Sequence, residues 1–149
     1  MQAVDQDFLP WLKQAIPLTE HLGIKELQWQ GDELTMDLSL APLVNDKGTG
    51  FGGGVAGLAT LLGWCYVTLL LDEHSRRCPV VVKESSNRFT APITADFSMH
   101  CWCEDEKGLE SFLNRYAEKG RGSLQLLIEA RQQGKAAFHY QGTYVALGN

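Results

Sequence analysis

The chain has 149 residues, of which 44% are hydrophobic, 21% charged and 9% aromatic, a composition typical of one globular domain spanning residues 1–149. The formal net charge of −5 at pH 7 argues against a nucleic-acid partner, because such partners need a concentrated basic face. The N-terminal residues lack the basic and apolar regions of a signal peptide. These features favour a cytoplasmic protein.

The first 40 residues predict one helix and two strands. Residues 5–16 show the apolar spacing of a short amphipathic helix. In residues 33–40 apolar and polar residues alternate, which is the period of a strand with one buried face. Residues 23–30 precede this segment across Gly31-Asp32, so the two segments are expected to form a hairpin.

A long apolar helix is expected from Gly52 to about Ser75. The 17 residues from Val55 to Leu71 are nearly all apolar, which is at the short end for a membrane span. The segment contains glycines and ends in Asp72-Glu73-His74. A helix buried on all sides in a folded domain explains the pattern better than a membrane span does.

The second half predicts four more strands. Segments 79–93 and 94–104 are strand-like, residues 106–119 are charged and expected to form a surface helix, and segments 123–131 and 135–147 are joined by Gln132-Gln133-Gly134 as a hairpin. One long helix and six mostly antiparallel strands predict an α+β fold in which the sheet wraps around the helix.

Residue types that bind zinc show no ligand spacing in this chain. Zinc needs three or four convergent ligands, so we expect no metal ion and reduced structural cysteines. The residues concerned are Cys65, Cys78, Cys101, Cys103, His21, His74, His100 and His139.

Glycines crowd the segment that precedes the long helix. Residues 48–53 match G-x-G-x-x-G, but the preceding strand ends near Leu40 and no βαβ unit follows, so a dinucleotide site is not expected. Glycines at a helix start expose backbone N–H groups where the helix dipole is positive, and such a place can hold an oxyanion. The alternative is that these glycines only let the loop turn and the helix pack closely.

Two motifs resemble the hotdog-fold thioesterases. One is Asn45-x-x-Gly48-x-x-Phe51-Gly52-Gly53, where many members carry His-Gly-Gly, and the other is Arg88-Phe89-x-x-Pro92. With the long helix, the pattern is most similar to the thioesterase family typified by the YiiD C-terminal domain. The resemblance implies a hotdog fold whose long central helix is wrapped by a six-stranded sheet.

The same resemblance implies a function and an assembly. The expected substrate is an acyl thioester of coenzyme A or of acyl carrier protein, with no further cofactor. The expected assembly is a homodimer or a dimer of dimers in which third strands pair. The substrate tunnel would then lie between the helix start of one subunit and residues of the other.

The chain departs from the superfamily pattern at two catalytic positions. Phe51 stands where the superfamily has histidine, and Thr60 stands nine residues later, where related enzymes carry an aspartate. The long helix has no carboxylate before Asp72. A dehydratase is the least favoured function, because its chemistry needs both missing groups.

Three alternatives remain for how the protein works without the usual catalytic carboxylate. In the first, Asn45 and Thr60 position a water while the amides of Gly52 and Gly53 hold the oxyanion. In the second, Glu84 acts as general base, although an ion pair with Lys83 or Arg88 at a solvated dimer seam is equally consistent. In the third, hydrolysis is lost and the protein is an acyl or acyl-carrier binding module, associated with an acetyltransferase.

Further residues are expected to contact substrate rather than to catalyse. Arg88 or Lys83 could meet the phosphates of coenzyme A, although an exposed structural charge is the alternative. The predicted substrate-binding residues are Phe51, Gly54, Ser85, Asn87 and Arg88. Histidines 100 and 139 are expected to be structural, and a Ser-His-Asp site is not expected because no nucleophile-elbow motif is present.

Overall fold

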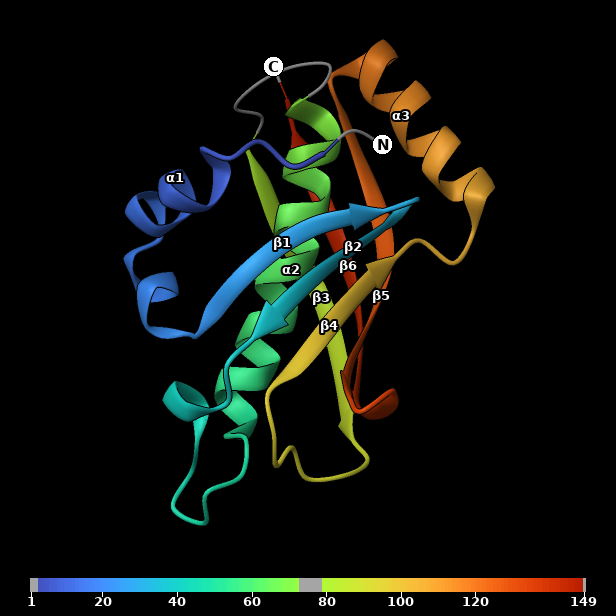
Figure 1. The fold of residues 1–149 in the computed structure, drawn as a ribbon. Coiled ribbons are helices and arrows are strands. Elements are labelled where there is room, and N and C mark those ends of the chain that lie inside the picture. The colour runs from blue at the N-terminus through green and yellow to red at the C-terminus, as the bar shows by residue number, and fades with distance from the viewer. Residues whose placement is uncertain (1–2, 73–78, 149) are drawn as a thin grey trace.

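The computed structural model describes residues 3–72 and 79–148, and its element order is the predicted one (Figure 1). The elements are α1 (Phe8–Ala15), the 3₁₀ helix η1 (Pro17–His21), β1 (Ile24–Gln30), β2 (Glu33–Leu38), the 3₁₀ helix η2 (Ala41–Leu43), α2 (Gly52–Asp72), β3 (Val80–Phe89), β4 (Phe97–Trp102), α3 (Glu106–Lys119), β5 (Arg121–Gln132) and β6 (Lys135–Leu147). The expected end of the long helix near Ser75, and with it His74 and Cys78, lies outside the described residues.

The strands form one six-stranded antiparallel sheet in the order β1-β2-β4-β5-β6-β3. Both predicted hairpins are confirmed, β1 with β2 and β5 with β6. At the second turn Gln133 and Gly134 both have positive φ, 51° and 77°, which matches the right-handed twist of the flanking strands. β1 and β3 are therefore the two edges of the sheet.

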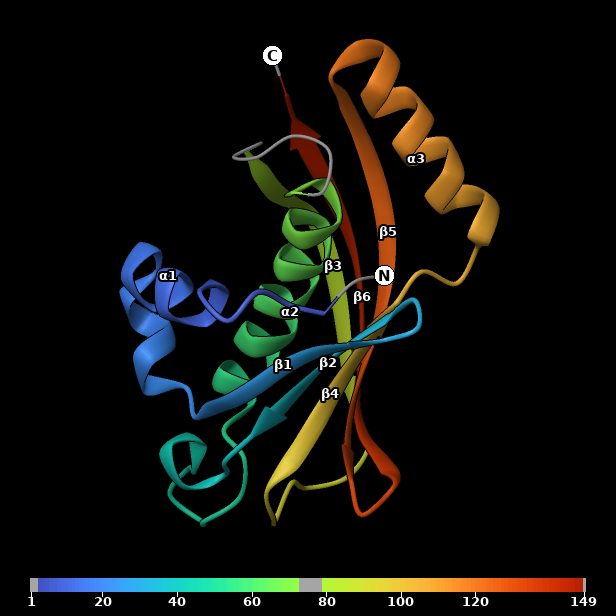
Figure 2. The same cartoon turned by 45° about the horizontal axis from the view of Figure 1, so that its top comes forward.

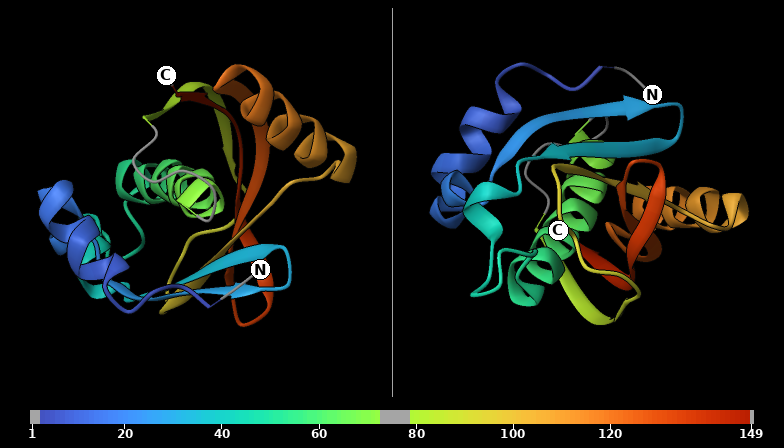
Figure 3. Two further views of the ribbon diagram at one scale, coloured as in Figure 1. Left: turned by 90° about the horizontal axis from the view of Figure 1, so that it is seen from above. Right: turned by 60° about the horizontal axis from the view of Figure 1, so that its bottom comes forward.

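The sheet curves around α2, which Figure 3 shows nearly end-on in its left view. α2 is apolar on all sides, and its buried residues include Leu58, Leu62, Cys65 and Leu70. Within the described residues, α2 is the one helix with the length and composition of a membrane span, and most of it is buried inside the domain. Its apolar character is thus explained by the core that it fills.

The two other α-helices lie on opposite sides of α2 (Figure 2). Trp11 of α1 stacks on Trp64 of α2, with ring centroids 6.1 Å apart and an interplanar angle of 12°. α3 packs against β5, where Phe112 lies in van der Waals contact with Gly122. Asp105 caps α3 by accepting a hydrogen bond from the N–H of Lys107.

Two tyrosines of β6, Tyr140 and Tyr144, connect this strand to the middle of α2 through hydrogen bonds. The Tyr144 hydroxyl donates to the Thr60 carbonyl at 2.7 Å and lies 3.0 Å from the Tyr140 hydroxyl. Burial, aided by the Tyr140 hydrogen bond, raises the pKa of Tyr144, so its hydroxyl remains a donor. A Cβ at Gly63 would overlap the Tyr144 ring, so the close approach of strand and helix requires glycine there.

Candidate functional site

The loop before α2 is held by its own hydrogen bonds. The Asn45 Oδ1 accepts from the N–H groups of Lys47 at 2.9 Å and Thr49 at 3.0 Å, and its Nδ2 donates to the Thr49 hydroxyl at 2.9 Å. The Phe51 N–H donates to the Leu43 carbonyl at 2.7 Å. This geometry makes Asn45 a loop-shaping residue, and its role in orienting water stays a prediction.

Three backbone N–H groups are free at the start of α2. They belong to Gly52, Gly53 and Gly54, the first residues of the helix, which have no intrahelical acceptor. Within the described chain no acceptor elsewhere engages these amides. A side chain at Gly53 would meet the Phe51 ring, 2.8 Å from the position of its Cβ. The entrance is therefore rich in donors, and the Phe51 ring packs beside the glycine at position 53.

An apolar cavity of about 720 Å³ is lined by Gly53 and Gly54, a size typical of small-molecule sites. One wall is the face of α2 that carries Gly53, Gly57, Thr60 and Trp64. No charged side chain lines the cavity in the part of the chain that the structure describes. The remaining lining residues are Ile16, Leu18, Thr19, Leu22, Pro42, Leu43, Val44, Phe51, Gly54, Leu61, Val80, Val81, Val82 and Tyr144.

Thr60 lies on the cavity wall, as its predicted role requires. Its hydroxyl donates to the Ala56 carbonyl one turn earlier, at 3.0 Å. The oxygen keeps lone pairs that can accept a hydrogen bond from a water or a substrate. A threonine hydroxyl can orient a water in this way, but it cannot remove a proton from it at neutral pH.

The pairing of β3 with β6 separates the predicted β3 residues into two faces. In antiparallel pairs, residues directly opposite each other point to the same face. Asn87 lies opposite the buried Tyr140 and Ser85 opposite Gly142, so both face α2. Two residues beyond Asn87, the Phe89 ring lies 3.3 Å from the position of a Cβ on Gly52. Ser85 and Asn87 therefore lie on the face that borders the helix start.

Glu84 and Arg88 lie on the other face of the sheet. Glu84 is opposite Thr143 and Arg88 is opposite His139, and these partners alternate with the core-facing residues of β6. A second strand added at the β3 edge would continue the same two faces. Neither Glu84 nor Arg88 points toward the Gly52 amides of the same chain, and their roles as base and phosphate contact stay predictions.

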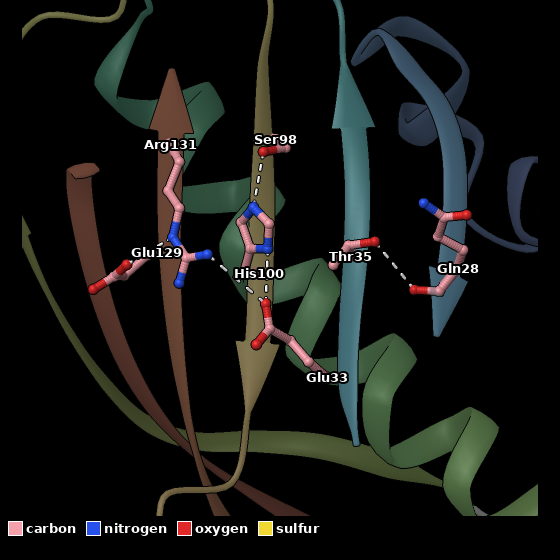
Figure 4. Close-up of polar contacts among 7 residues, drawn as sticks. All are labelled: Gln28, Glu33, Thr35, Ser98, His100, Glu129 and Arg131. Atoms are coloured by element: carbon pink, nitrogen blue, oxygen red, sulfur yellow. Dashed lines mark hydrogen bonds and ion pairs between the residues drawn. The ribbon is translucent and has the colours of Figure 1, made fainter. Parts of the chain in front are cut away.

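A polar network covers the outer face of the central strands (Figure 4). The Ser98 hydroxyl lies 2.8 Å from His100 Nε2, and His100 Nδ1 lies 2.7 Å from Glu33 Oε1. Beside them, Arg131 Nε donates to Glu129 at 2.9 Å. Sequence reasoning missed this arrangement because Glu33 reaches His100 only through the pairing of β2 with β4, although the i, i+2 spacing of Ser98 and His100 was a usable signal.

The network has the order of a Ser-His-Glu triad but lacks an oxyanion site made by the backbone. β4 is paired on both sides, with β2 and β5, so its N–H groups serve the sheet. Acyl transfer at a serine needs free donors aimed at the developing oxyanion. The free donors are at the start of α2 instead, on the opposite face of the sheet.

Among the described residues, the buried cysteines and the metal-binding residue types offer no competing site. Burial raises the pKa of Cys65 and Cys101, so both remain thiols, which are poor nucleophiles. Within the described residues, no three His, Cys, Asp or Glu side chains lie close enough to hold a metal ion. The helix start and its cavity are thus the candidate site.

The family scan matches residues 6–148 to the model described as "Putative thioesterase (yiiD_Cterm)". The chain belongs to the YiiD C-terminal thioesterase family. The match spans every element of the fold, including the glycine entrance and β3. It confirms the family that the sequence motifs resembled.

Solved structures confirm the hotdog fold of this family member. A protein of unknown function from Chlorobaculum tepidum matches with a TM-score of 0.82 and 26% identity over 94% of this chain and 91% of that one. A protein from Shewanella oneidensis described as a putative thioesterase matches with a TM-score of 0.78 and 24% sequence identity, over 96% of this chain and 99% of that one. A thioesterase from Haemophilus influenzae matches with a TM-score of 0.75 and 17% sequence identity, over 99% of this chain and 93% of that one.

Proposed function

We propose that this YiiD C-terminal family member hydrolyses acyl thioesters of coenzyme A or acyl carrier protein at the start of α2. The observation that carries the proposal is that Gly53 and Gly54, which follow Gly52 in the first turn of α2 and have free amides, line an apolar cavity. The acyl chain occupies the cavity, and the thioester carbonyl lies at the amides of Gly52 and Gly53. The thiol-bearing carrier remains outside.

The reaction needs only water besides the thioester. Water that has lost a proton to bulk solvent attacks as hydroxide: its oxygen bonds to the carbonyl carbon, and the negative charge that develops on the carbonyl oxygen is held by the two amides and the helix dipole. The C–S bond then breaks, the leaving sulfur takes up a proton through solvent, and the products at neutral pH are a free thiol and a carboxylate. Thr60 accepts a hydrogen bond from the attacking hydroxide, and Ser85 and Asn87 lie on the face of β3 that borders the helix start.

The pH profile should show no side-chain base. Since no Asp, Glu or His lines the cavity among the described residues, kcat/KM should rise about tenfold per pH unit from about pH 6 to 8, as for attack by hydroxide without general base catalysis. The measurement is initial-rate thiol release, corrected for spontaneous hydrolysis, with folding monitored by circular dichroism. A plateau with an apparent pKa in the carboxylate or histidine range would contradict the absence of a base.

Variants on the outer face should leave turnover intact. Glu84→Ala and Ser98→Ala should each keep kcat/KM within about threefold of wild type, whereas loss of a general base or nucleophile costs about 10²–10⁴-fold. A fluorophosphonate probe should likewise fail to label Ser98. A large loss in either variant, with the fold intact, would move the reaction to the outer face of the sheet.

We propose a homodimer formed through the β3 edge, with a dimer of dimers as the larger assembly. The exposed edge carries large apolar side chains, with Val81 45%, Val82 40% and Phe89 52% exposed. An unpaired edge strand is a natural site for pairing with a second copy. The free cysteines among the described residues, Cys65, Cys101 and Cys103, favour a cytoplasmic, reducing location.

A second candidate function is acyl or acyl-carrier binding without hydrolysis, in association with an acetyltransferase. The replacement of the helix carboxylate by Thr60 favours it, because the cavity persists without the base. Binding of an acyl thioester without any thiol release would identify this function.

A further inference from the structure

The cavity wall offers a ligand no free side-chain donor. The Thr19 hydroxyl donates to the Ile16 carbonyl at 2.7 Å, and the Trp64 Nε1–H donates to the Val80 carbonyl at 3.0 Å. The hydroxyls of Thr60 and Tyr144 donate to carbonyl groups of α2. These four are the side-chain donors of the lining residues. A hydroxyl or charged group placed deep in this cavity would lose water without gaining a donor.

Gly57 keeps part of the cavity empty. A Cβ at this position would meet nothing within 4 Å, so no close packing explains the glycine. Glycine inside a helix is less favourable than alanine, and Gly63 in the same helix has the packing reason that Gly57 lacks. The empty space next to Gly57 belongs to the cavity.

The face of α2 that lines the cavity has a defined length. From Gly53 to Trp64, the first and last residues of α2 in the lining, the helix rises about 16 Å, roughly the length of an extended chain of a dozen carbons. The indole of Trp64 is fixed by its hydrogen bond to Val80 and by stacking on Trp11. Trp64 therefore forms a fixed wall at the end of this helix face that lies away from Gly53.

We infer that the substrate carries an unsubstituted aliphatic acyl chain of about eight to twelve carbons, and that Gly57 is the residue that leaves room for it. The inference rests on the proposed thioesterase function and assigns its substrate class. Acyl groups with two to four carbons leave the cavity largely unfilled. Chains with a hydroxyl group bury that group against an apolar wall.

Chain length should therefore set the rate. Each added methylene should raise kcat/KM up to about fourfold until the chain reaches Trp64. Gly57→Phe fills the space beside the helix, so the optimum should shift to butyryl-CoA, with dodecanoyl-CoA turnover reduced at least about tenfold. Gly57→Ala adds a single methyl group to the same wall, so it should reduce dodecanoyl-CoA turnover far less than Gly57→Phe does.

The test measures thiol release by wild type, Gly57→Phe and Gly57→Ala with acetyl-, butyryl-, octanoyl-, dodecanoyl- and 12-hydroxydodecanoyl-CoA. The inference predicts a preference for octanoyl- and dodecanoyl-CoA, weaker use of the hydroxylated chain, and a loss in Gly57→Phe confined to long chains. A flat chain-length profile in wild type, or an equal loss for all chains in a folded Gly57→Phe, would overturn it.

A second readout separates this inference from the proposed function. Octanoate and dodecanoate should raise the melting temperature of wild type and of Gly57→Ala but not that of Gly57→Phe, whether or not hydrolysis occurs. If no thioester is hydrolysed but these shifts appear, the proposed function fails and the chain-length inference stands. If hydrolysis occurs but neither fatty acid shifts the melting temperature of wild type, the chain-length inference fails alone.

Discussion

Gly63→Ala is expected to lower the free energy of unfolding by about 2–4 kcal/mol. The added methyl group would overlap the ring and hydroxyl of Tyr144. To make room, the ring must leave a position where it is completely buried and hydrogen-bonded to the Thr60 carbonyl. Moving it would break the contact between α2 and β6 and leave that hydroxyl without its acceptor.

Gly57→Ala provides the matched control in the same helix. It should raise the free energy of unfolding by about 0.5–1 kcal/mol, because alanine is the better helix former and its Cβ meets nothing within 4 Å. Urea denaturation followed by circular dichroism gives both values. Equal effects of the two substitutions would mean that Tyr144 does not pack against Gly63 as described.

Gly52→Pro is expected to lower kcat by about 10²–10³-fold, the usual cost of removing one oxyanion donor. Proline lacks the N–H but tolerates the first helical position, where no intrahelical bond is lost. Phe51 lies outside the helix, so the proline would not follow a residue of the helix, where it is disfavoured. The substitution thus removes the proposed donor with little change to the helix.

Gly52→Ala separates the effect of losing the backbone N–H from the effect of adding a side chain. Like proline, alanine at this position places a Cβ close to Phe89, whose ring is half exposed and able to shift. Unlike proline, alanine keeps the backbone N–H of residue 52. We expect Gly52→Ala to retain most of the wild-type kcat. If Gly52→Pro matches Gly52→Ala while both fold normally, the Gly52 amide is not an oxyanion donor.

The sequence predicted the fold because the relevant signals are local. Alternation in β2, the glycine turns of both hairpins and the uninterrupted apolar run of α2 each specify one element. The order of these elements then leaves few ways to bury a helix that is apolar on all sides. The family motifs also predicted that the glycine-rich segment leads into the long helix, and the structure places Gly52–Gly54 in the first turn of α2.

The roles of the β3 residues were not predictable, because they depend on which face each side chain takes. Both faces of β3 carry polar residues, so no alternation marks the inner one. A shift in the pairing with β6 between Val82 and Glu84 also changes which residues share a face. Only the pairing with Tyr140 and Thr143 shows that Asn87 points toward α2 and that Glu84 points away.

Hydrogen-bond partners explain what could not be predicted from the sequence about Asn45 and His100. Asn45 has the residue type and position of a site residue, but its amide is used by the neighbouring loop residues. His100 obtains Glu33 as a partner from a strand distant in the sequence. Neither competition between partners nor long-range pairing can be read from one sequence.

The most direct test of the central claim is thiol release from dodecanoyl-CoA by the folded wild-type protein, with Gly52→Pro and Glu84→Ala alongside. The account predicts saturable release that is proportional to enzyme, that falls about 10²–10³-fold in Gly52→Pro, and that persists in Glu84→Ala. Release that persists in Gly52→Pro but disappears in Glu84→Ala, or no release from a folded wild-type protein, would contradict hydrolysis at the start of α2.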